Sequence, residues 1–342
     1  MTENFAALVV DKNEEQFSAE VKTLSIADLP EGDVLIRVHY SSVNYKDSLA
    51  SIPNGNIVKS YPFVPGIDLA GVVVSSKNPR FNKGDEVIAT SYGIGVSHYG
   101  GYSEYASIPS EWIVPLPKGL SLKEAMIIGT AGFTAALSVQ ALENQQITPD
   151  KGSVLVTGAT GGVGSFAVAI LSALGYSVEA STGKQTAHDF LKQLGANAVL
   201  SREEVYDGKI RALGKQRWAA AVDPVGGEQL AAILSQINYG GSVAVSGLTG
   251  GGNVPTSVFP FILRGVNLLG IDSVECPMSK REAVWQRLAS DFKPAHLEQL
   301  VHEEVTLAQL PDILPILLKG EAKGRFLVKL MNKSASAPFS TV

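Results

Sequence analysis

Four glycines fall within seven residues in the segment Gly158-Ala-Thr-Gly-Gly-Val-Gly164. An apolar run typical of a strand, Ser153–Thr157, precedes the segment, and a run of mostly small apolar residues, Ser165–Leu174, follows it. Glycines at this spacing permit a tight turn, let backbone amides approach a phosphate, and let the next helix pack closely on the strand. The pattern therefore predicts a turn that binds the pyrophosphate of a dinucleotide, and the alternative is a purely structural turn.

Two other kinds of glycine loop do not fit this segment. A mononucleotide P-loop requires Gly-Lys-Ser/Thr, whereas Gly164 is followed by Ser165 and Phe166. The turn of short-chain dehydrogenases lies near the N-terminus and is accompanied by a Tyr-x-x-x-Lys pair. None of the ten tyrosines has lysine four positions later. A βαβ dinucleotide-binding unit is the interpretation that remains.

The residues at the end of the second strand, Tyr176–Ser181, indicate whether the site prefers a cofactor with a free ribose hydroxyl or one with a ribose phosphate. Units that bind NAD usually end this strand with Asp or Glu, but Glu179 lies inside the strand and Thr182-Gly-Lys184 follows it. Arg202 follows the next short strand and can converge on the same place. A charge-assisted hydrogen bond is worth about 1.5–3 kcal/mol, so two cations on a ribose phosphate would select NADPH. The alternative is that both are solvated surface charges.

The elements around these residues predict two domains in the 342-residue chain. Residues 1–125 and 295–342 form a β-rich domain with many turn formers. In residues 126–294 strands and helices alternate, which predicts a doubly wound parallel sheet. A capping box, Ser121-Leu-Lys-Glu124, predicts the start of a helix over Ala125–Leu142 that leads into the second domain. Predicted strands are Val34–Tyr40, Gly71–Ser75, Glu86–Ala89, Trp112–Leu116, Ala198–Leu200, Ala219–Val222, Ser242–Ser246, Leu268–Asp272 and Arg325–Leu330, and further helices are Thr186–Leu194, Glu228–Ile237, Lys280–Phe292 and Leu307–Leu318.

Composition argues against several classes of function. The net charge is −5 and no dense cluster of Lys and Arg occurs, so nucleic-acid binding is not expected. The N-terminus lacks the pattern of a signal peptide, and the apolar stretch Ala125–Val139 is too short and too interrupted to span a bilayer. We therefore expect a cytoplasmic protein with no membrane partner. Cys276 is the one cysteine, which excludes an intramolecular disulfide and a thiolate-rich zinc lobe.

A β-rich domain, a dinucleotide-binding domain and a return strand together resemble the medium-chain dehydrogenase/reductase superfamily. The segments that resemble its zinc-ligand regions are Ser41–Asp47 and Pro65–Gly71, and they lack the Cys and His-Glu ligands. The five histidines show no ligand spacing. We therefore expect no metal. Without a metal to polarise a carbonyl, reduction of a conjugated double bond is favoured over alcohol oxidation.

Six motifs carry a closer resemblance, which runs from the first strand to Leu330. The sequence is similar to the zinc-free quinone oxidoreductase branch and most similar to its acrylyl-CoA reductase group. This resemblance implies a GroES-like catalytic domain followed by a Rossmann domain. The motifs are Asn44-Tyr-Lys-Asp47, Pro65-Gly-Ile-Asp68, Ile128–Thr134, Thr157–Gly164, Asn238-Tyr-Gly-Gly241 and Pro260–Arg264 with Gly270-Ile-Asp-Ser273.

The same resemblance implies the residues of the site. Asp47 and Asp68 are expected to be structural residues that cap turns, and Arg264 could either meet a CoA phosphate or anchor a loop. The implied cofactor contacts are Tyr45 beside the nicotinamide; Thr160, Gly161, Gly162 and Val163 at the pyrophosphate; Thr182, Gly183, Lys184 and Arg202 at the ribose phosphate; Leu248, Ile262 and Ser273 along the nicotinamide half; and Arg325 from the return strand.

The implied reaction is addition of hydride from NADPH to the β-carbon of a short enoyl-CoA such as acrylyl-CoA, with protonation at the α-carbon. Tyr45 would position the substrate or relay that proton, or would only pack against the nicotinamide. The alternatives are an NADPH:quinone oxidoreductase and a non-catalytic NADPH-binding protein. A homodimer is also implied, through edge strands around Leu268–Val274. The tail Ser334–Val342 is expected to be loose.

Overall fold

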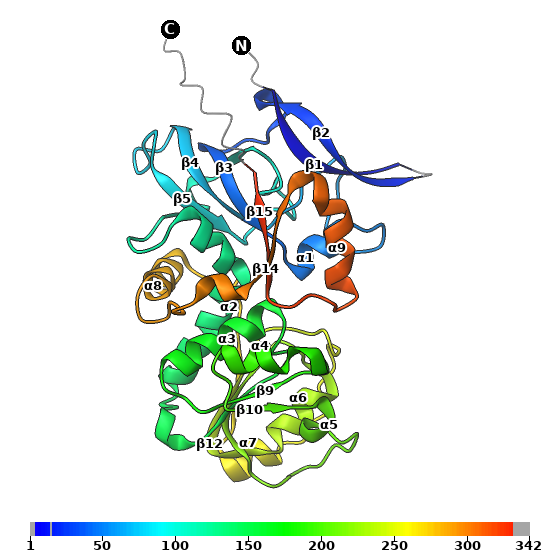
Figure 1. The fold of residues 1–342 in the computed structure, drawn as a ribbon, viewed down its shortest axis with the longest axis vertical. Coiled ribbons are helices and arrows are strands. Elements are labelled where there is room, and N and C mark those ends of the chain that lie inside the picture. Colours follow the sequence, from blue (N-terminus) through cyan, green and yellow to red (C-terminus); the bar gives the residue numbers. More distant parts are fainter. Residues whose placement is uncertain (1–3, 14–15, 331–342) are drawn as a thin grey trace. The chain divides into compact units, whose positions relative to one another are not determined.

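The computed structural model describes residues 4–13 and 16–330, and its chain forms two compact units (Figure 1). Unit 1 consists of Met1–Thr130, Val301–Glu321 and Arg325–Val342, and unit 2 consists of Ala131–Leu300 and Ala322–Gly324. The sequence predicted changes of domain after residues 125 and 294, and the chain changes unit after residues 130 and 300. The predicted loose tail, Ser334–Val342, lies outside the described residues.

Unit 1 is built on a sheet with the strand order β14-β15-β3-β4-β5-β7, and β6 also pairs with β3. All pairs in this sheet are antiparallel except β14 with β15. Apolar residues alternate along β3, so one face of this strand is buried. The strands of unit 1 are β1 (Asn4–Lys12), β2 (Phe17–Ser25), β3 (Val34–Ser42), β4 (Asp68–Ser76), β5 (Glu86–Thr90), β6 (Tyr105–Ile108), β7 (Ile113–Pro115), β14 (Val301–Thr306) and β15 (Arg325–Lys329), and its helices are α1 (Tyr45–Ala50) and α9 (Leu310–Leu318).

Helix α2 (Leu122–Asn144) carries the chain from unit 1 into unit 2. The predicted capping box is confirmed: the Ser121 amide donates to a Glu124 carboxylate oxygen (2.9 Å) and the Glu124 amide donates to Ser121 Oγ (3.2 Å). The helix is longer than the apolar stretch that the sequence suggested, and it is kinked at Gly129, whose φ of 51° and ψ of −160° are not helical. By length and composition alone it could cross a membrane, but 83% of its most apolar window is buried in the structure, as in a core helix.

Unit 2 contains a parallel sheet with the strand order β10-β9-β8-β11-β12-β13. This is the order of a doubly wound dinucleotide-binding fold, as predicted. Its strands are β8 (Val154–Val156), β9 (Val178–Ser181), β10 (Ala198–Leu200), β11 (Trp218–Asp223), β12 (Ile237–Val245) and β13 (Asn267–Gly270), and its helices are α3 (Gly162–Ala173), α4 (His188–Gln193), α5 (Arg202–Val205), α6 (Gly227–Leu234), α7 (Phe259–Arg264) and α8 (Met278–Leu288).

One boundary in unit 2 corrects the prediction. The predicted helix Glu228–Ile237 ends at Leu234, and Ile237 begins β12 instead. Ile237 is fully buried in the core cluster that contains Trp218, with which it pairs across the sheet. Tertiary burial therefore overrides the local helical pattern.

The strand order reverses between β8 and β11, because β9 and β10 lie on one side of β8 and β12 and β13 lie on the other side of β11. In open parallel sheets ligands bind outside the carboxyl ends of the strands at such a switch point. The fold therefore directs attention to the segment that follows β8.

Candidate active site

The glycine turn connects β8 to α3 at this switch point. The Thr157 amide donates to Val222 O (3.1 Å), and the Ala159 amide donates to Ser181 O (3.1 Å), so the turn lies across the ends of three strands. Gly158 has φ 50°, and a side chain on Gly164 would collide with the backbone of Gly158 and Ala159. Two of the four glycines are thus required by backbone conformation or close packing.

Helix α3 begins at this turn without a side-chain cap. Its N-cap is Gly161, and no side chain accepts a hydrogen bond from the amides of the first turn. An uncapped N-terminus of a twelve-residue helix presents amides and the positive end of the helix dipole to an anion. Gly161, Gly162 and Val163, predicted at the pyrophosphate, lie at this end.

A buried carboxylate, which the sequence analysis missed, fastens the turn to β11. Asp223 ends β11, accepts a hydrogen bond from Thr157 Oγ1, and accepts another from the Gly226 amide (2.8 Å). Burial raises the pKa of Asp223. A lone acidic residue at the end of the apolar run Ala219–Val222 was the signal that could have identified it.

The end of β9 gathers the residues predicted at the ribose phosphate. Arg202 packs against Gly183, where a side-chain carbon would lie 2.9 Å from Arg202 Nε and 3.0 Å from Cζ. The Lys184 amide donates to Thr182 Oγ1 (3.1 Å). The structure therefore brings Thr182, Gly183, Lys184 and Arg202 together, as the sequence predicted.

Glu179 is directed elsewhere. Its two carboxylate oxygens accept hydrogen bonds from Ser153 Oγ (3.0 Å) and Trp218 Nε1 (2.8 Å), which belong to neighbouring segments of the sheet. This carboxylate is therefore occupied within the sheet and does not serve as the acid that ends the second strand of an NAD-binding unit.

The short return segment Ala322–Gly324 lies against the same region. The Gly324 amide donates to Thr160 O (2.9 Å), and Lys184 Nζ donates to Ala322 O. No sequence pattern predicted these contacts, which join residues more than a hundred positions apart.

The remaining predicted contacts of unit 2 lie on three separate segments. Leu248 and Ile262 are exposed apolar side chains, and Ser273 is half-buried with its carbonyl accepting from Arg281 Nη2 (2.8 Å). Their contact with a cofactor stays a prediction. Arg264 donates to the carbonyls of Ser235 and Gly214 (both 2.7 Å), so its guanidinium anchors a loop.

In unit 1, Tyr45 is the first residue of α1 and its side chain is 46% exposed. Asp47 caps this helix, as predicted: its Oδ2 accepts from the Asn44 amide and its Oδ1 accepts from the Ile67 amide (both 2.8 Å). Burial and the nearby Asp68 carboxylate raise the pKa of Asp47 to about 7. The cap holds the N-terminus of α1, and with it Tyr45, in a fixed backbone position.

A buried polar cluster lies beside this helix, and we call Ser42, Asn44, Asp68, Thr130 and Arg325 the Asp68 cluster. Asp68 accepts from Ser42 Oγ (2.6 Å), Asn44 Nδ2 (2.7 Å) and the amide and hydroxyl of Thr130 (2.9 and 2.5 Å). Asp68 is thus structural, as expected, but it joins several segments instead of capping one turn.

Arg325 closes the Asp68 cluster. Its guanidinium is 3% exposed, lies 3.7 Å from the Asp68 carboxylate, and donates to Ser42 Oγ (2.7 Å), Asn44 Oδ1 (3.0 Å) and Val43 O (3.1 Å). Burial lowers the pKa of Arg325. These contacts give Arg325 a structural role, and its predicted contact with the cofactor stays a prediction.

The zinc-ligand regions of the family carry a different chemistry in this chain. Among residues 4–13 and 16–330, no group of three or more His, Cys, Asp and Glu could hold a metal ion. The oxygens of Asp68 are occupied by hydrogen-bond donors and face a guanidinium, which would repel a cation. The residues present do not fit zinc.

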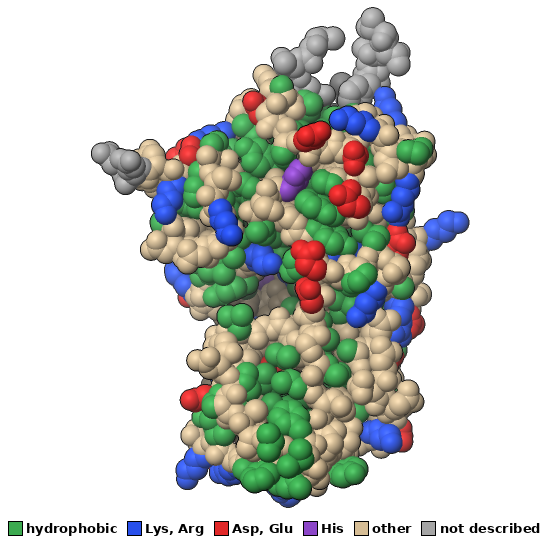
Figure 2. Space-filling model, turned by 180° about the vertical axis from the view of Figure 1, so that it is seen from behind, with side chains coloured by type: hydrophobic (Ala, Val, Ile, Leu, Met, Phe, Trp, Pro, Cys, Tyr) green, Lys and Arg blue, Asp and Glu red, His purple; other side chains and the backbone are tan. Residues whose placement is uncertain are grey.

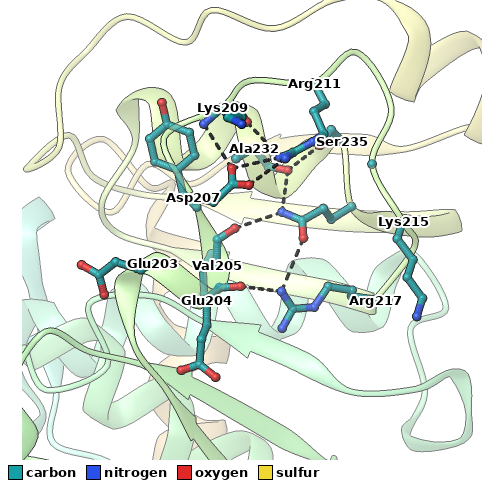
Figure 3. Close-up of a pocket in the computed structure, with 13 residues that line it drawn as sticks. Glu203, Glu204, Val205, Asp207, Lys209, Arg211, Lys215, Arg217, Ala232 and Ser235 are labelled. Atoms are coloured by element: carbon teal, nitrogen blue, oxygen red, sulfur yellow. Dashed lines mark hydrogen bonds and ion pairs between the residues drawn. The ribbon is translucent and has the colours of Figure 1, made fainter.

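A separate cavity of about 300 Å³ in unit 2 lies between α5, the loop 206–217 and the end of α6 (Figure 3). Both arginines that line it bond to neighbouring residues: Arg217 donates to Glu204 O (2.6 Å), and Arg211 pairs with Asp207 (2.7 Å). None of the predicted cofactor residues is among the residues that line it. This cavity is therefore distinct from the predicted dinucleotide site.

Comparison with known proteins covers both units. Residues 30–118 match the alcohol dehydrogenase GroES-like domain, and residues 162–290 match the domain described as zinc-binding dehydrogenase. The first match lies in unit 1 and the second in unit 2. The predicted combination of a GroES-like domain and a Rossmann domain is confirmed.

Three relatives match nearly the whole chain. The putative quinone oxidoreductase YhfP of Bacillus subtilis is 62% identical over 330 residues, which are 96% of this chain and 100% of that protein. Its crystal structure with NAD bound gives a TM-score of 0.95. The acrylyl-CoA reductase AcuI of Ruegeria pomeroyi is 50% identical and covers 95% of this chain and 98% of its own. The yhdH oxidoreductase of Salmonella enterica, solved in complex with NADP, is 48% identical, covers 95% of this chain and 100% of its own, and gives a TM-score of 0.93.

Proposed function

Because this chain belongs to the zinc-free quinone oxidoreductase branch of the medium-chain dehydrogenase/reductase family, and is therefore an oxidoreductase, we propose that it reduces a short enoyl-CoA such as acrylyl-CoA with NADPH. The observation that carries this proposal is the 50% identity to an acrylyl-CoA reductase over almost the whole chain. The product of acrylyl-CoA would be propionyl-CoA. The chain's family membership sets aside a purely non-catalytic role.

The preference for NADPH rests on the end of β9. A dianionic ribose phosphate needs cations and hydroxyls, and Thr182, Lys184 and Arg202 supply them around Gly183. The carboxylate that would favour an unphosphorylated ribose is not available, because Glu179 is bound inside the sheet. Of the relatives, YhfP has been solved with NAD and the Salmonella protein with NADP.

The chain's own residues would bind the cofactor, orient the substrate and protonate its α-carbon. When bound, NADPH supplies hydride to the β-carbon of the enoyl thioester. The amides at the start of α3 would hold the pyrophosphate, and the cations at the end of β9 would hold the ribose phosphate. The electron pair displaced to the α-carbon must then take up a proton. Tyr45, through its hydroxyl or an ordered water, is our candidate to deliver it or to position the substrate.

The Tyr45→Phe variant separates the two roles of Tyr45. Loss of a general acid lowers kcat by about 10²–10⁴-fold, while a residue that only packs against the nicotinamide loses little when its ring is kept. Measurement of NADPH binding to the same variant is the control. Since the side chain is 46% exposed, we expect the variant to fold.

The second candidate function is NADPH:quinone oxidoreductase, because the relative with 62% identity is named a putative quinone oxidoreductase. The test follows NADPH oxidation with acrylyl-CoA, crotonyl-CoA and a quinone side by side. A higher kcat/KM on an enoyl-CoA supports our proposal, and turnover of the quinone alone refutes it. The CoA nucleotide is charged, so added salt should raise KM for acrylyl-CoA more than for acrylyl-pantetheine or the quinone.

We further propose a homodimer formed through β13. This strand ends the sheet order of unit 2, and Leu268 on it is exposed, as are Leu263 and Ile262 on α7. Figure 2 shows hydrophobic side chains gathered on one face of unit 2. An unpaired apolar edge is a template for pairing with a second copy.

The cytoplasmic location and the absence of nucleic-acid and membrane partners also remain predictions.

Light scattering tests the dimer. Leu268→Lys should halve the mass in solution, whereas Val21→Lys on β2, which is exposed to the same fraction of 41%, should leave it unchanged. An unaltered mass for Leu268→Lys would place the interface elsewhere.

A further inference from the structure

The return segment Ala322–Gly324 belongs to unit 2, although the residues before and after it belong to unit 1. Its backbone is held at two points of the predicted cofactor site, because Gly324 donates to Thr160 O (2.9 Å) and Ala322 O accepts from Lys184 Nζ. Gly324 has φ 66°, and a side chain there would collide with Leu300 O. The segment is therefore fixed in place by contacts that need no ligand.

Lys323 is the side chain that this fixed segment presents. Its Nζ lies 6.0 Å from the centroid of the Phe190 ring, on helix α4, and the side chain is half-buried. Helix α4 begins four residues after Lys184. The Lys323 ammonium thus lies near the Phe190 ring, on the helix that follows the end of β9.

Three cations lie on the segments that contact one another here: Lys184 and Arg202 at the end of β9, and Lys323 next to Ala322, whose carbonyl Lys184 contacts. Within the described part of the chain neither Lys323 nor Arg202 forms an ion pair. Because three positive charges lie on these neighbouring segments, an anion that binds beside them is attracted by each. A phosphate monoester has three acceptor oxygens and a charge near −2, which matches this set.

We propose that Lys323 is a third ligand of the ribose 2′-phosphate, and that the Ala322 carbonyl orients the Lys184 ammonium toward the same group. This inference rests on the proposed use of NADPH. Selectivity for the phosphorylated cofactor is then shared between the end of β9 and a segment 138 residues later in the chain.

The test compares adenosine 2′,5′-bisphosphate with 5′-AMP, which differ only in the 2′-phosphate, by calorimetry on the full chain. The Lys323→Met variant loses one charge-assisted contact at a partly exposed site, so its Kd for the bisphosphate should rise about tenfold. Its Kd for 5′-AMP should stay within about twofold of the value for the unmodified protein. Lys323→Arg, which keeps the charge, should retain most of the affinity. The matched control is Lys319→Met, which removes an exposed lysine at the end of α9 and should change neither ligand.

The outcomes separate this inference from the proposed function. If the unmodified protein binds both nucleotides equally, the preference for NADPH fails. If it prefers the bisphosphate and Lys323→Met keeps that preference, or if the variant weakens both nucleotides equally, the role of Lys323 is wrong while the preference stands.

Discussion

Replacing Arg325 by Met tests the Asp68 cluster, because methionine is apolar and has neither charge nor donors. The guanidinium is 3% exposed and has hydrogen bonds to Ser42, Val43 and Asn44 in addition to its ion pair with Asp68. Removing one partner of a buried ion pair costs about 3–5 kcal/mol. At about 2–4 °C per kcal/mol this lowers Tm by roughly 6–20 °C.

The assay is thermal unfolding followed by calorimetry, combined with a double-mutant cycle. Asp68→Asn removes the charge that Arg325→Met leaves uncompensated, so the double variant should lose less than the sum of the single variants by about 0.5–3 kcal/mol. The Tm of Arg325→Lys should lie between those of the wild type and Arg325→Met, because lysine keeps a positive charge but lacks the planar fork of the guanidinium. Lys118→Met is the exposed control and should change stability by less than about 0.5 kcal/mol.

Two results would refute this reasoning. One is a loss below about 1 kcal/mol for Arg325→Met, the range of an exposed pair. The other is additivity within about 0.5 kcal/mol in the cycle, which would mean that Arg325 and Asp68 do not act on each other.

Three further predictions concern both units. Arg202→Ala should raise KM for NADPH by about tenfold and hardly change KM for NADH. The tenfold figure corresponds to the lower end of the free energy of a charge-assisted hydrogen bond, because the Arg202 side chain is exposed. Equal increases in KM for both cofactors would contradict its role. The pKa of Asp47 is raised from 3.8 to about 7, so the folded state favours the protonated acid and stability should fall by about 4 kcal/mol as pH rises from about 4 through 7. In Asp47→Asn the change of Tm across this range should be flatter, and an unchanged slope would count against the assignment. Gly129→Ala should lower the free energy of unfolding in urea by more than about 2 kcal/mol, because φ is 51° and ψ is −160° and the added carbon would lie 2.5 Å from Asp68 Oδ2. The control is Gly175→Ala, which should lower it less, because Gly175 has φ 82° but no atom within 4 Å of the added carbon.

Local signals in the sequence were sufficient for most of unit 2. The glycine turn, the apolar strand before it and the helix after it are neighbours in the chain, so their spacing alone predicts the βαβ unit. The convergence of Lys184 and Arg202 could also be predicted, because the carboxyl ends of adjacent parallel strands meet at one edge of the sheet.

Elements whose pattern is short or mostly exposed were missed. Strand β14, Val-His-Glu-Glu-Val-Thr, is largely exposed and shows no clear alternation, and it exists because β15 pairs with it. The hairpin of β1 and β2 was missed because β2 has no buried residue to mark it. Helix α1 has six residues, too few for a periodic signal.

The polar parts of the site depend on distant segments. Asp68 joins residues from β3, the start of α1 and the kink of α2, and Arg325 adds the return strand. Nothing in the neighbourhood of Asp68 in the sequence indicates these partners. Ala322 and Lys323 are likewise placed by contacts with residues more than a hundred positions away.

The long separation in sequence between Arg325 and its hydrogen-bond acceptors has a consequence for synthesis. Its acceptors in unit 1 lie 281 to 283 residues earlier, so β3 and Asp68 leave the ribosome long before the strand and the guanidinium that complete their surroundings. The strands of unit 2, by contrast, come from one continuous stretch of the chain that emerges in full before Arg325 does. In a nascent chain that ends before residue 325, unit 2 should therefore be protected from protease while unit 1 is still cleaved, and unit 1 should become resistant only after β15 has emerged.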